Sequence, residues 1–155
     1  MGYTVEKLNL KDLVLILELT KSVVVNSTSK FISDKALEFT NNGDSDKYIK
    51  KNANNIYVLK YNSIIIGVAI INNNTIESLY IDDKYQNIGA GSTFLFHLLI
   101  MLFGNFSKVK AKCFNKNDIA NSFYLRNGFI FNECVRNQYF NEDLSSFSMV
   151  NPNIV

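Results

Sequence analysis

One stretch of the chain decides its fold: Ile76-Glu77-Ser78-Leu79-Tyr80-Ile81-Asp82-Asp83-Lys84-Tyr85-Gln86-Asn87-Ile88-Gly89-Ala90-Gly91-Ser92. It joins an expected strand to an expected helix through a turn that holds two glycines. A helix that begins at such a turn presents unpaired backbone N–H groups and the positive end of its dipole, and both favour an anion such as a diphosphate group. Gly89 and Gly91 carry no side chain where phosphate oxygens would approach the backbone. The stretch therefore indicates an anion-binding turn.

Two other phosphate-binding loops do not fit this turn. The chain has neither the GK[ST] ending of a nucleoside-triphosphate loop nor the GxGxxG pattern of a dinucleotide-binding fold. Because two glycines near a helix start more often form an ordinary turn, the stretch alone does not identify a ligand. A phosphate group would have to be held in another way.

Three strands are expected around and before this stretch. Residues 56–60, 64–71 and 75–81 are rich in β-branched and aromatic residues, and the Asn- and Ser-containing segments 61–63 and 72–74 read as the turns between them. Upstream, residues 3–8 alternate like a strand and residues 11–24 carry apolar residues at helical spacing. Between residues 26 and 55 the pattern is weak, with short helices expected at 34–39 and 46–51.

Downstream of the turn the pattern changes to helix, strand and helix. An apolar helix covers 94–103, a strand covers 108–113, and a helix begins near Asn117 and ends at Asn127-Gly128, where glycine suits a C-terminal cap. Residues 129–136 and 147–150 are expected as closing strands. Helices on a mixed, mostly antiparallel sheet predict one α+β domain spanning residues 1–155.

Composition narrows the class of protein. A chain of 155 residues with a net charge of +2 lacks the strong basic character of a nucleic-acid-binding protein. Its longest apolar run, 94–103, is short of the about 20 residues that cross a bilayer. Cys113 and Cys134 lack the spacing of a redox or zinc site and are expected as buried free thiols. The N-terminus has no export signal, so we expect a cytoplasmic protein that binds neither nucleic acid nor membrane nor metal.

Two motifs in order resemble one family. Gln86-Asn87-Ile88-Gly89-Ala90-Gly91 is similar to the Q/R-x-x-G-x-G/A loop of the GNAT acetyltransferases, and Leu79-Tyr80-Ile81 is similar to the Leu-x-Val strand before it. Asn117 to Phe129 resembles the pattern N-x-x-A-x-x-x-Y-x-x-x-G-F, one helix and one strand further on. The resemblance covers about residues 75–130 and implies the GNAT fold, an acyl-CoA N-acyltransferase fold.

The resemblance also implies which residues contact acetyl-CoA. Backbone amides of residues 87–92 would bind the diphosphate, the backbone of Tyr80 and Ile81 would pair with the pantetheine arm like an added strand, and the second motif would add side-chain contacts. The amide of Ile81 could polarise the thioester carbonyl. The implied coenzyme-binding residues are Leu79, Tyr80, Ile81, Gln86, Asn87, Ile88, Gly89, Ala90, Gly91, Ser92, Asn117, Asn121, Tyr124 and Arg126.

Two residues are candidates for proton transfer. Tyr124 matches the tyrosine that protonates the leaving thiolate in the family, although outside the motif it would read as an amphipathic core residue. Glu77 is the candidate base. Strict alternation places it with Leu79 and Ile81 on one face, where burial would raise its pKa, and the alternative is a solvated edge carboxylate. His97, the only histidine, is expected to be a hydrogen-bonded core or boundary residue.

The activity implied is transfer of the acetyl group of acetyl-CoA to a primary amine of a small molecule or peptide, by direct attack in a ternary complex. The alternative is a non-catalytic acyl-CoA-binding module that acts through a protein partner. A third possibility is an α+β protein without a ligand. A bacterial cytoplasm is the expected setting and a homodimer is possible, while the acceptor and the strictness for acetyl stay open.

Overall fold

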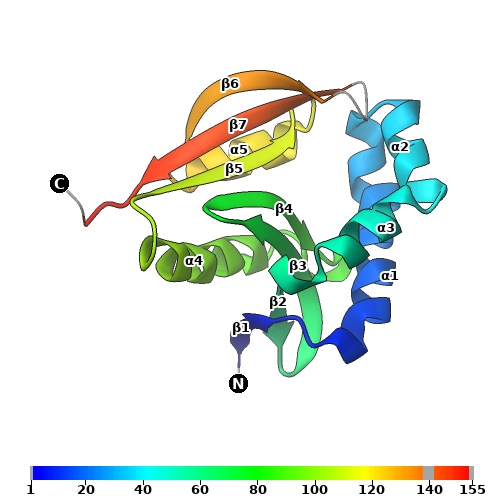
Figure 1. Cartoon of the computed structure of the whole chain (residues 1–155), viewed down its shortest axis with the longest axis horizontal. Helices are drawn as coiled ribbons and strands as arrows, with labels where there is room; N and C mark the ends of the chain where they lie inside the picture. The colour runs from blue at the N-terminus through cyan, green and yellow to red at the C-terminus, as the bar shows by residue number, and fades with distance from the viewer. Residues whose placement is uncertain (1, 138–141, 154–155) are drawn as a thin grey trace.

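The chain forms a seven-stranded mixed sheet flanked by helices, as the sequence predicts (Figure 1). The computed structural model describes residues 2–137 and 142–153. The strands lie in the order β1-β2-β3-β4-β5-β7-β6, and every neighbouring pair is antiparallel except β4 and β5. Their bounds are β1 Tyr3–Lys7, β2 Ile56–Tyr61, β3 Ile64–Asn72, β4 Thr75–Ile81, β5 Lys108–Phe114, β6 Ile130–Asn137 and β7 Glu142–Val150.

Five α-helices and several short turns of helix connect the strands. A π-helical segment, η2 (Val24–Thr28), continues directly from the first helix, and a 3-10 turn, η5 (Asp83–Tyr85), follows β4. Across residues 2–137 and 142–153, no helix is both long and apolar enough to span a membrane. The α-helices are α1 Leu13–Val23, α2 Asp34–Asn41, α3 Asp44–Lys51, α4 Ala90–Phe103 and α5 Asp118–Arg126.

The turns between β2, β3 and β4 use asparagine and serine in the left-handed conformation. Asn62 and Ser63 have φ of 48° and 70°, and Asn73 has φ of 54°. Two consecutive residues with positive φ match the right-handed twist of a tight hairpin, and asparagine tolerates this region better than most residues do. These turns confirm that the polar segments 61–63 and 72–74 separate three consecutive antiparallel strands.

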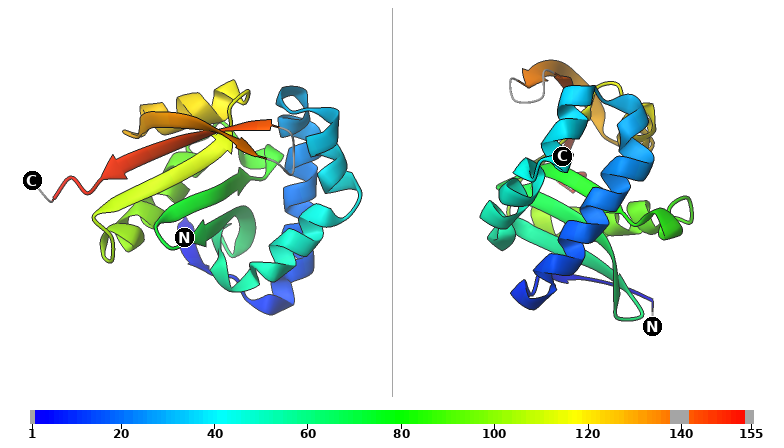
Figure 2. Two further views of the ribbon diagram at one scale, coloured as in Figure 1. Left: turned by 45° about the horizontal axis from the view of Figure 1, so that its top comes forward. Right: turned by 90° about the vertical axis from the view of Figure 1, so that its right-hand side faces the viewer.

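Each face of the sheet has its own apolar core. On one face, Phe94, Leu95 and Leu98 of α4 pack with Tyr124 of α5 in a cluster that includes Ile76 and Ile81 of β4. On the other face, Ile16 of α1 and Ile49 of α3 pack over the middle of β2 and β3. Figure 2 shows α1 and α4 on opposite faces of the sheet. We call these the α4 face and the α1 face.

Two boundaries differ most from the sequence prediction. The apolar helix α4 begins at Ala90, directly after the turn, instead of at Phe94. The last strand, β7, begins at Glu142 instead of at Phe147. Its first half is polar, and it is a strand because β5 pairs with it on one side and β6 on the other. Local β-propensity could not show a strand that depends on two neighbours distant in sequence.

Candidate active site

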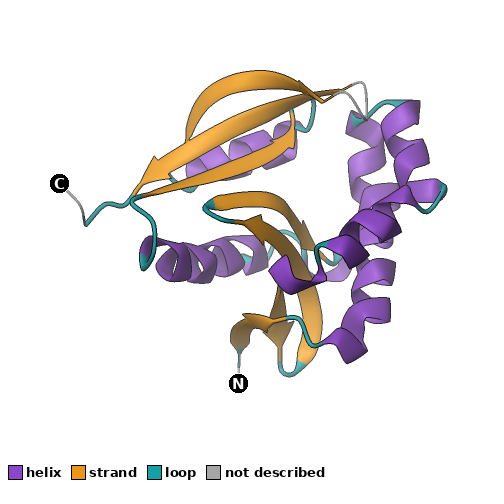
Figure 3. Cartoon of the chain, in the orientation of Figure 1, coloured by secondary structure: helices purple, strands orange, loops and turns teal. Residues whose placement is uncertain are grey.

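The two parallel strands β4 and β5 separate after a short contact. They pair only at Thr75 with Lys110 and Ile76 with Ala111, and the N–H of Lys110 donates to the carbonyl of Asn74 over 2.8 Å. Both strands are described along their whole length, and no further pairing joins them. Figures 1 and 3 show β5 diverging from β4 while it stays beside β7. From Glu77 to Ile81, β4 therefore has one edge without a strand partner.

Alternation along β4 shows which backbone groups face this open edge. The N–H of Asp82 donates to the carbonyl of Ile66 over 2.8 Å, and so points towards β3. In an antiparallel pair, successive residues point their N–H and C=O groups to opposite sides. Tyr80 therefore also points its backbone groups towards β3, whereas Leu79 and Ile81 point theirs towards the open edge. The expectation that the backbone of Tyr80 faces a ligand was wrong, because its alternation with Ile81 turns it to β3.

The turn that follows is shaped by two left-handed residues. Asn87 has φ of 63° and Gly89 has φ of 86°, and α4 begins at Ala90. Gly89 closes the first turn of the helix, because its carbonyl accepts from the N–H of Thr93 over 3.0 Å. The first N–H groups of a helix have no partner within it. The N–H groups of Ala90, Gly91 and Ser92 are therefore directed out of the N-terminus of α4.

The side chain of Gln86 braces this turn from within. Its Nε2 donates to the carbonyl of Ile81 over 2.9 Å and to a carboxylate oxygen of Asp83 over 3.2 Å. The bond to Ile81 spans the connection from the end of β4 to the glycine turn. Gly91 has a packing role here, since a Cβ at this position would lie 3.3 Å from Cε1 of Phe123 on α5. The turn is thus fixed to β4 and to α5.

Tyr124 lies in the core between the diverging strands. Only 3% of its surface is exposed, and its ring packs against Phe123, Phe129 and Phe147 at centroid distances of 5.3, 5.4 and 5.5 Å. Burial raises the pKa of Tyr124 well above its ordinary value, and electrostatic interaction with Cys113 and Tyr80 raises it further. Because Cys113 belongs to β5 and Tyr80 to β4, the phenol lies within electrostatic range of both strands. It stays protonated at every ordinary pH.

The two asparagines of the second motif are engaged with the backbone. The side chain of Asn117 caps α5 by accepting from the N–H of Ala120 over 3.1 Å. The amide nitrogen of Asn121 donates to three carbonyls, those of Phe114, Asn115 and Asn117, over 3.2, 3.1 and 2.7 Å. Asn121 thereby holds the connection from β5 to α5 in place. Its amide oxygen is the atom that a ligand could use.

Glu77 does not lie on the face that strict alternation predicts. The register between β3 and β4 shifts at Ile70/Ile71, so Ile76 and Ile81 lie in the same core cluster although they are five residues apart. The irregularity turns Glu77 to the α1 face, where its carboxylate lies 3.6 Å from Nζ of Lys112. The side chain is partly covered, with 23% of its surface exposed. The assignment of Glu77 to the face of Leu79 and Ile81 was wrong.

Tyr48 of α3 lies near Glu77, and the sequence analysis missed it. Burial raises the pKa of Tyr48 to about 12, helped by the negative charge of Glu77 and by Tyr80. Tyr48 falls in the segment where no motif was legible, so only the packing of α3 could reveal this contact. On the α1 face, the opening between β4 and β5 thus carries the carboxylate of Glu77, the ammonium of Lys112 and the phenols of Tyr48 and Tyr80.

The remaining candidate residues lie further out. Arg126 is exposed in the last turn of α5. His97 is exposed, so the expected core or boundary placement was wrong, although its Nδ1 does share a hydrogen bond of 2.8 Å with the carbonyl of Thr93. Cys113 is half-buried as expected, but Cys134 is exposed on β6, contrary to the expectation of a buried thiol. The part of the chain that the structure describes contains no cluster of three potential metal ligands.

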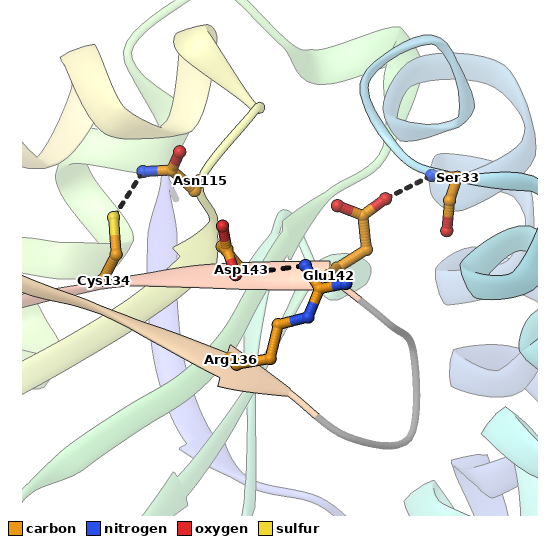
Figure 4. A network of polar contacts seen from close by, with 6 residues as sticks. All are labelled: Ser33, Asn115, Cys134, Arg136, Glu142 and Asp143. Atoms are coloured by element: carbon orange, nitrogen blue, oxygen red, sulfur yellow. Dashed lines mark hydrogen bonds and ion pairs between the residues drawn. The ribbon is translucent and has the colours of Figure 1, made fainter.

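A polar network joins the end of the sheet to α2 (Figure 4). The buried carboxylate of Glu142, which is 2% exposed, accepts from the backbone N–H of Ser33 at the start of α2. Nearby, Asn115 donates to Cys134 over 3.0 Å and to Ser145 over 2.9 Å. No local pattern predicts the contact of Glu142, because its partner is 109 residues away. The hydrogen bond between Glu142 and Ser33 holds the start of α2 beside the end of the sheet where β5 ends and β7 begins.

Comparisons with known structures identify the fold. A GCN5-related N-acetyltransferase from Rhodopseudomonas palustris superposes with a TM-score of 0.82 at 11% identity, covering 97% of each chain. A PaiA N-acetyltransferase from Thermoplasma acidophilum, in complex with coenzyme A, gives 0.72 at 18% identity over 94% of this chain and 98% of the other. An acetyl transferase from Salmonella typhimurium that modifies the N-terminal serine of a ribosomal subunit protein gives 0.72 at 15% identity, over 97% and 96%.

Sequence comparison gives the family. No curated protein matches the chain significantly. The family model described as an acetyltransferase (GNAT) domain matches residues 23–149, which is most of the chain. This match confirms the resemblance carried by the two motifs and extends it to the segment between α1 and β2, where no motif was legible. The chain belongs to the GNAT acetyltransferase family.

Proposed function

We propose that this chain is an N-acetyltransferase that moves the acetyl group of acetyl-CoA to a primary amine of a small molecule or peptide. The observation that carries the proposal is the open edge of β4 from Glu77 to Ile81, which leads directly into the turn at Gly89. An extended molecule with amide groups and a diphosphate at one end suits this combination. Coenzyme A has both features.

The open edge offers backbone groups for the pantetheine arm. Leu79 and Ile81 face the edge, and the N–H and C=O of Leu79 and the N–H of Ile81 would pair with the amides of the arm as an added strand would, while the carbonyl of Ile81 accepts from Gln86. Tyr80 points its backbone to β3, so its contribution would come from its side chain. The diphosphate would then lie over the N–H groups that follow Asn87, where the helix dipole of α4 also favours negative charge.

The second motif would complete the coenzyme site. Arg126 is exposed on α5 and would meet a phosphate group of the coenzyme. Asn121 would contribute through its amide oxygen, because its amide nitrogen already donates to three carbonyls. Asn117 would act mainly through its capping of α5, which orients the rest of the motif.

The reaction would take place where β4 and β5 separate. The nitrogen of a neutral amine attacks the thioester carbonyl carbon, the C–S bond breaks, and the proton of the Tyr124 hydroxyl passes to the departing thiolate. The new amide nitrogen loses its surplus proton, which returns to the Tyr124 oxygen through solvent, so the products are the amide and the free thiol. The N–H of Ile81 would stabilise the negative charge that develops on the carbonyl oxygen. A buried phenol with a raised pKa is fully protonated, and therefore able to donate, at neutral pH.

Glu77 would accept the proton of the ammonium group from the α1 face. It is partly covered, it faces the side opposite α4, and Tyr48 lies close to it. The ion pair with Lys112 orients the carboxylate, which suits a base acting directly or through water. The amine would approach between α3 and the open edge, in a region bounded by α2 and α3.

Thiol release from acetyl-CoA over a panel of amines tests the proposal. We expect coenzyme A in large excess to stabilise the chain by about 3–4 kcal/mol in thermal unfolding, and at least one amine to release thiol in proportion to the enzyme. Stabilisation without transfer to any amine would favour the non-catalytic acyl-CoA-binding module. The absence of both effects would refute the proposed function. Propionyl-CoA in the same assay tests whether the acyl group must be acetyl.

A further inference from the structure

Asp83 collects hydrogen bonds from two segments that are distant in sequence. From the turn after β4, Gln86 Nε2 donates to Oδ1 over 3.2 Å. From the end of α1 and the π-helical segment η2, the Ser27 hydroxyl donates to Oδ1, Asn26 Nδ2 donates to Oδ2 over 3.1 Å, and the Ser22 hydroxyl makes a longer contact of 3.5 Å. Four side chains therefore share one carboxylate.

The π-helical segment η2 makes this convergence possible. A π-turn contains an extra residue compared with an α-turn, so it rotates the side chains that follow it, and such segments occur frequently at functional sites. In this chain η2 covers Val24–Thr28 and directly continues α1. Both Asn26 and Ser27, which are neighbours in sequence, reach the same carboxylate.

Electrostatics alone would make an acidic residue undesirable here. Asp83 lies three residues before Gln86, at the start of the connection to the expected diphosphate site, and a carboxylate repels a diphosphate. The side chain of its neighbour Asp82 carries the same charge and accepts from the N–H of Lys84 over 3.0 Å, a contact within its own turn. The two carboxylates are therefore alike in charge and different in what they connect.

We propose that Asp83 is a positioning residue, which fixes the coenzyme turn against η2 and so sets the direction of the turn's N–H groups. The chain of contacts runs from η2 through Asp83 and Gln86 to the carbonyl of Ile81, at the end of the open edge of β4. One junction thereby aligns the diphosphate end and the pantetheine end of the site. This inference rests on the proposed function, since it assigns a role within the same coenzyme site.

The variant D83N tests the proposal, with D82N as its matched control. Both remove one negative charge, but only D83N places an NH₂ group against the donors of Asn26 or Gln86. We expect D83N to weaken coenzyme A binding about tenfold or more in isothermal titration, the effect of losing charge-assisted hydrogen bonds. The KM for acetyl-CoA should rise similarly while kcat at saturation stays within about threefold. D82N should bind as tightly as the unaltered chain, or slightly more tightly.

A double-mutant cycle separates positioning from a general loss of structure. S27A should weaken coenzyme A binding, and the D83N/S27A double variant should bind no more weakly than D83N alone, because the two residues act through one contact. If D83N does not fold, the N26A/S27A variant, which retains the carboxylate, should weaken binding in its place. Unchanged or tighter binding by D83N, or additive effects in the cycle, would overturn the proposal. Failure of the unaltered chain to bind coenzyme A would instead refute the proposed function.

Discussion

The sharpest prediction concerns the hydroxyl of Tyr124. Tyr124→Phe removes one oxygen atom and leaves the ring, which contacts Phe123, Phe129 and Phe147. Because the ring is retained and only 3% of the residue is exposed, the core does not need to repack. We expect the free energy of unfolding to change by no more than about 1 kcal/mol, the net value of a single hydrogen bond.

The effect on turnover should be much larger than the effect on stability. Proton transfer from a positioned side chain contributes about 10²- to 10⁴-fold to a rate. Without the phenol, the thiolate would have to leave unprotonated or take its proton from water. We therefore expect kcat to fall by about 10² or more, while coenzyme affinity stays within about threefold because the turn and the open edge of β4 are untouched.

Thiol release at saturating acetyl-CoA measures kcat, and titration calorimetry measures coenzyme affinity separately. Tyr57→Phe, on β2 away from the divergence of the strands, controls for loss of a phenolic hydroxyl elsewhere in the molecule. The unaltered enzyme should show no alkaline loss of activity up to about pH 10, since the pKa of Tyr124 is raised above its ordinary value of 10.0. Turnover that is unchanged in Tyr124→Phe would remove this residue from the mechanism.

Three further predictions test the turn, the second motif and the thiols. Gly89→Ala places alanine at φ of 86°, which costs about 1–2 kcal/mol, so both stability and coenzyme affinity should fall. Gly43→Ala, at φ of 91° before α3, should lose similar stability with no change in coenzyme affinity. If calorimetry gave the two variants equal affinity for coenzyme A, a role of the Gly89 turn in binding would be disproved. Asn121→Ala removes a donor shared by three carbonyls, of which those of Phe114 and Asn117 keep a backbone N–H, and should lower the free energy of unfolding in urea by about 1–3 kcal/mol. Lost affinity at full stability would instead make the side chain a ligand. Burial raises the pKa of Cys113 to about 12, so iodoacetamide at pH 8 should label the exposed Cys134 and leave Cys113 unmodified. Mass spectrometry detects the labelled residue, and prompt labelling of both would contradict the burial of Cys113.

Local signals were enough to predict the centre of the fold. The strands β2, β3 and β4 were expected within one residue of their observed ends, because β-branched runs and asparagine-rich turns act over a few residues. The cap of α5 was likewise readable, since Asn117 and Gly128 mark its ends through side-chain and backbone geometry at single positions. The glycine turn belongs to the same class of local signal.

The parts that the sequence did not show depend on distant partners. The face of Glu77 follows from a register shift against β3, which alternation within β4 cannot reveal. Asp83 reads as a solvated loop residue until Ser27, 56 positions away, is placed beside it. Tyr48 and Glu142 likewise gain their neighbours only through the packing of α3 and α2. In each case a contact over a long sequence separation gives the residue its role.

The open edge of β4 also explains how the fold can keep a gap in its sheet. Buried backbone N–H and C=O groups need partners, and an unpaired edge normally invites association with another chain. Here each diverging strand is secured on its other side, β4 by six register pairs with β3 and β5 by seven with β7. The sheet therefore tolerates the opening without losing either half. The N–H and C=O of Leu79 and the N–H of Ile81 remain available, since only the carbonyl of Ile81 already accepts from Gln86. They suit a ligand with amides spaced like those of a peptide, which is a property of the pantetheine arm and not of a flat aromatic molecule.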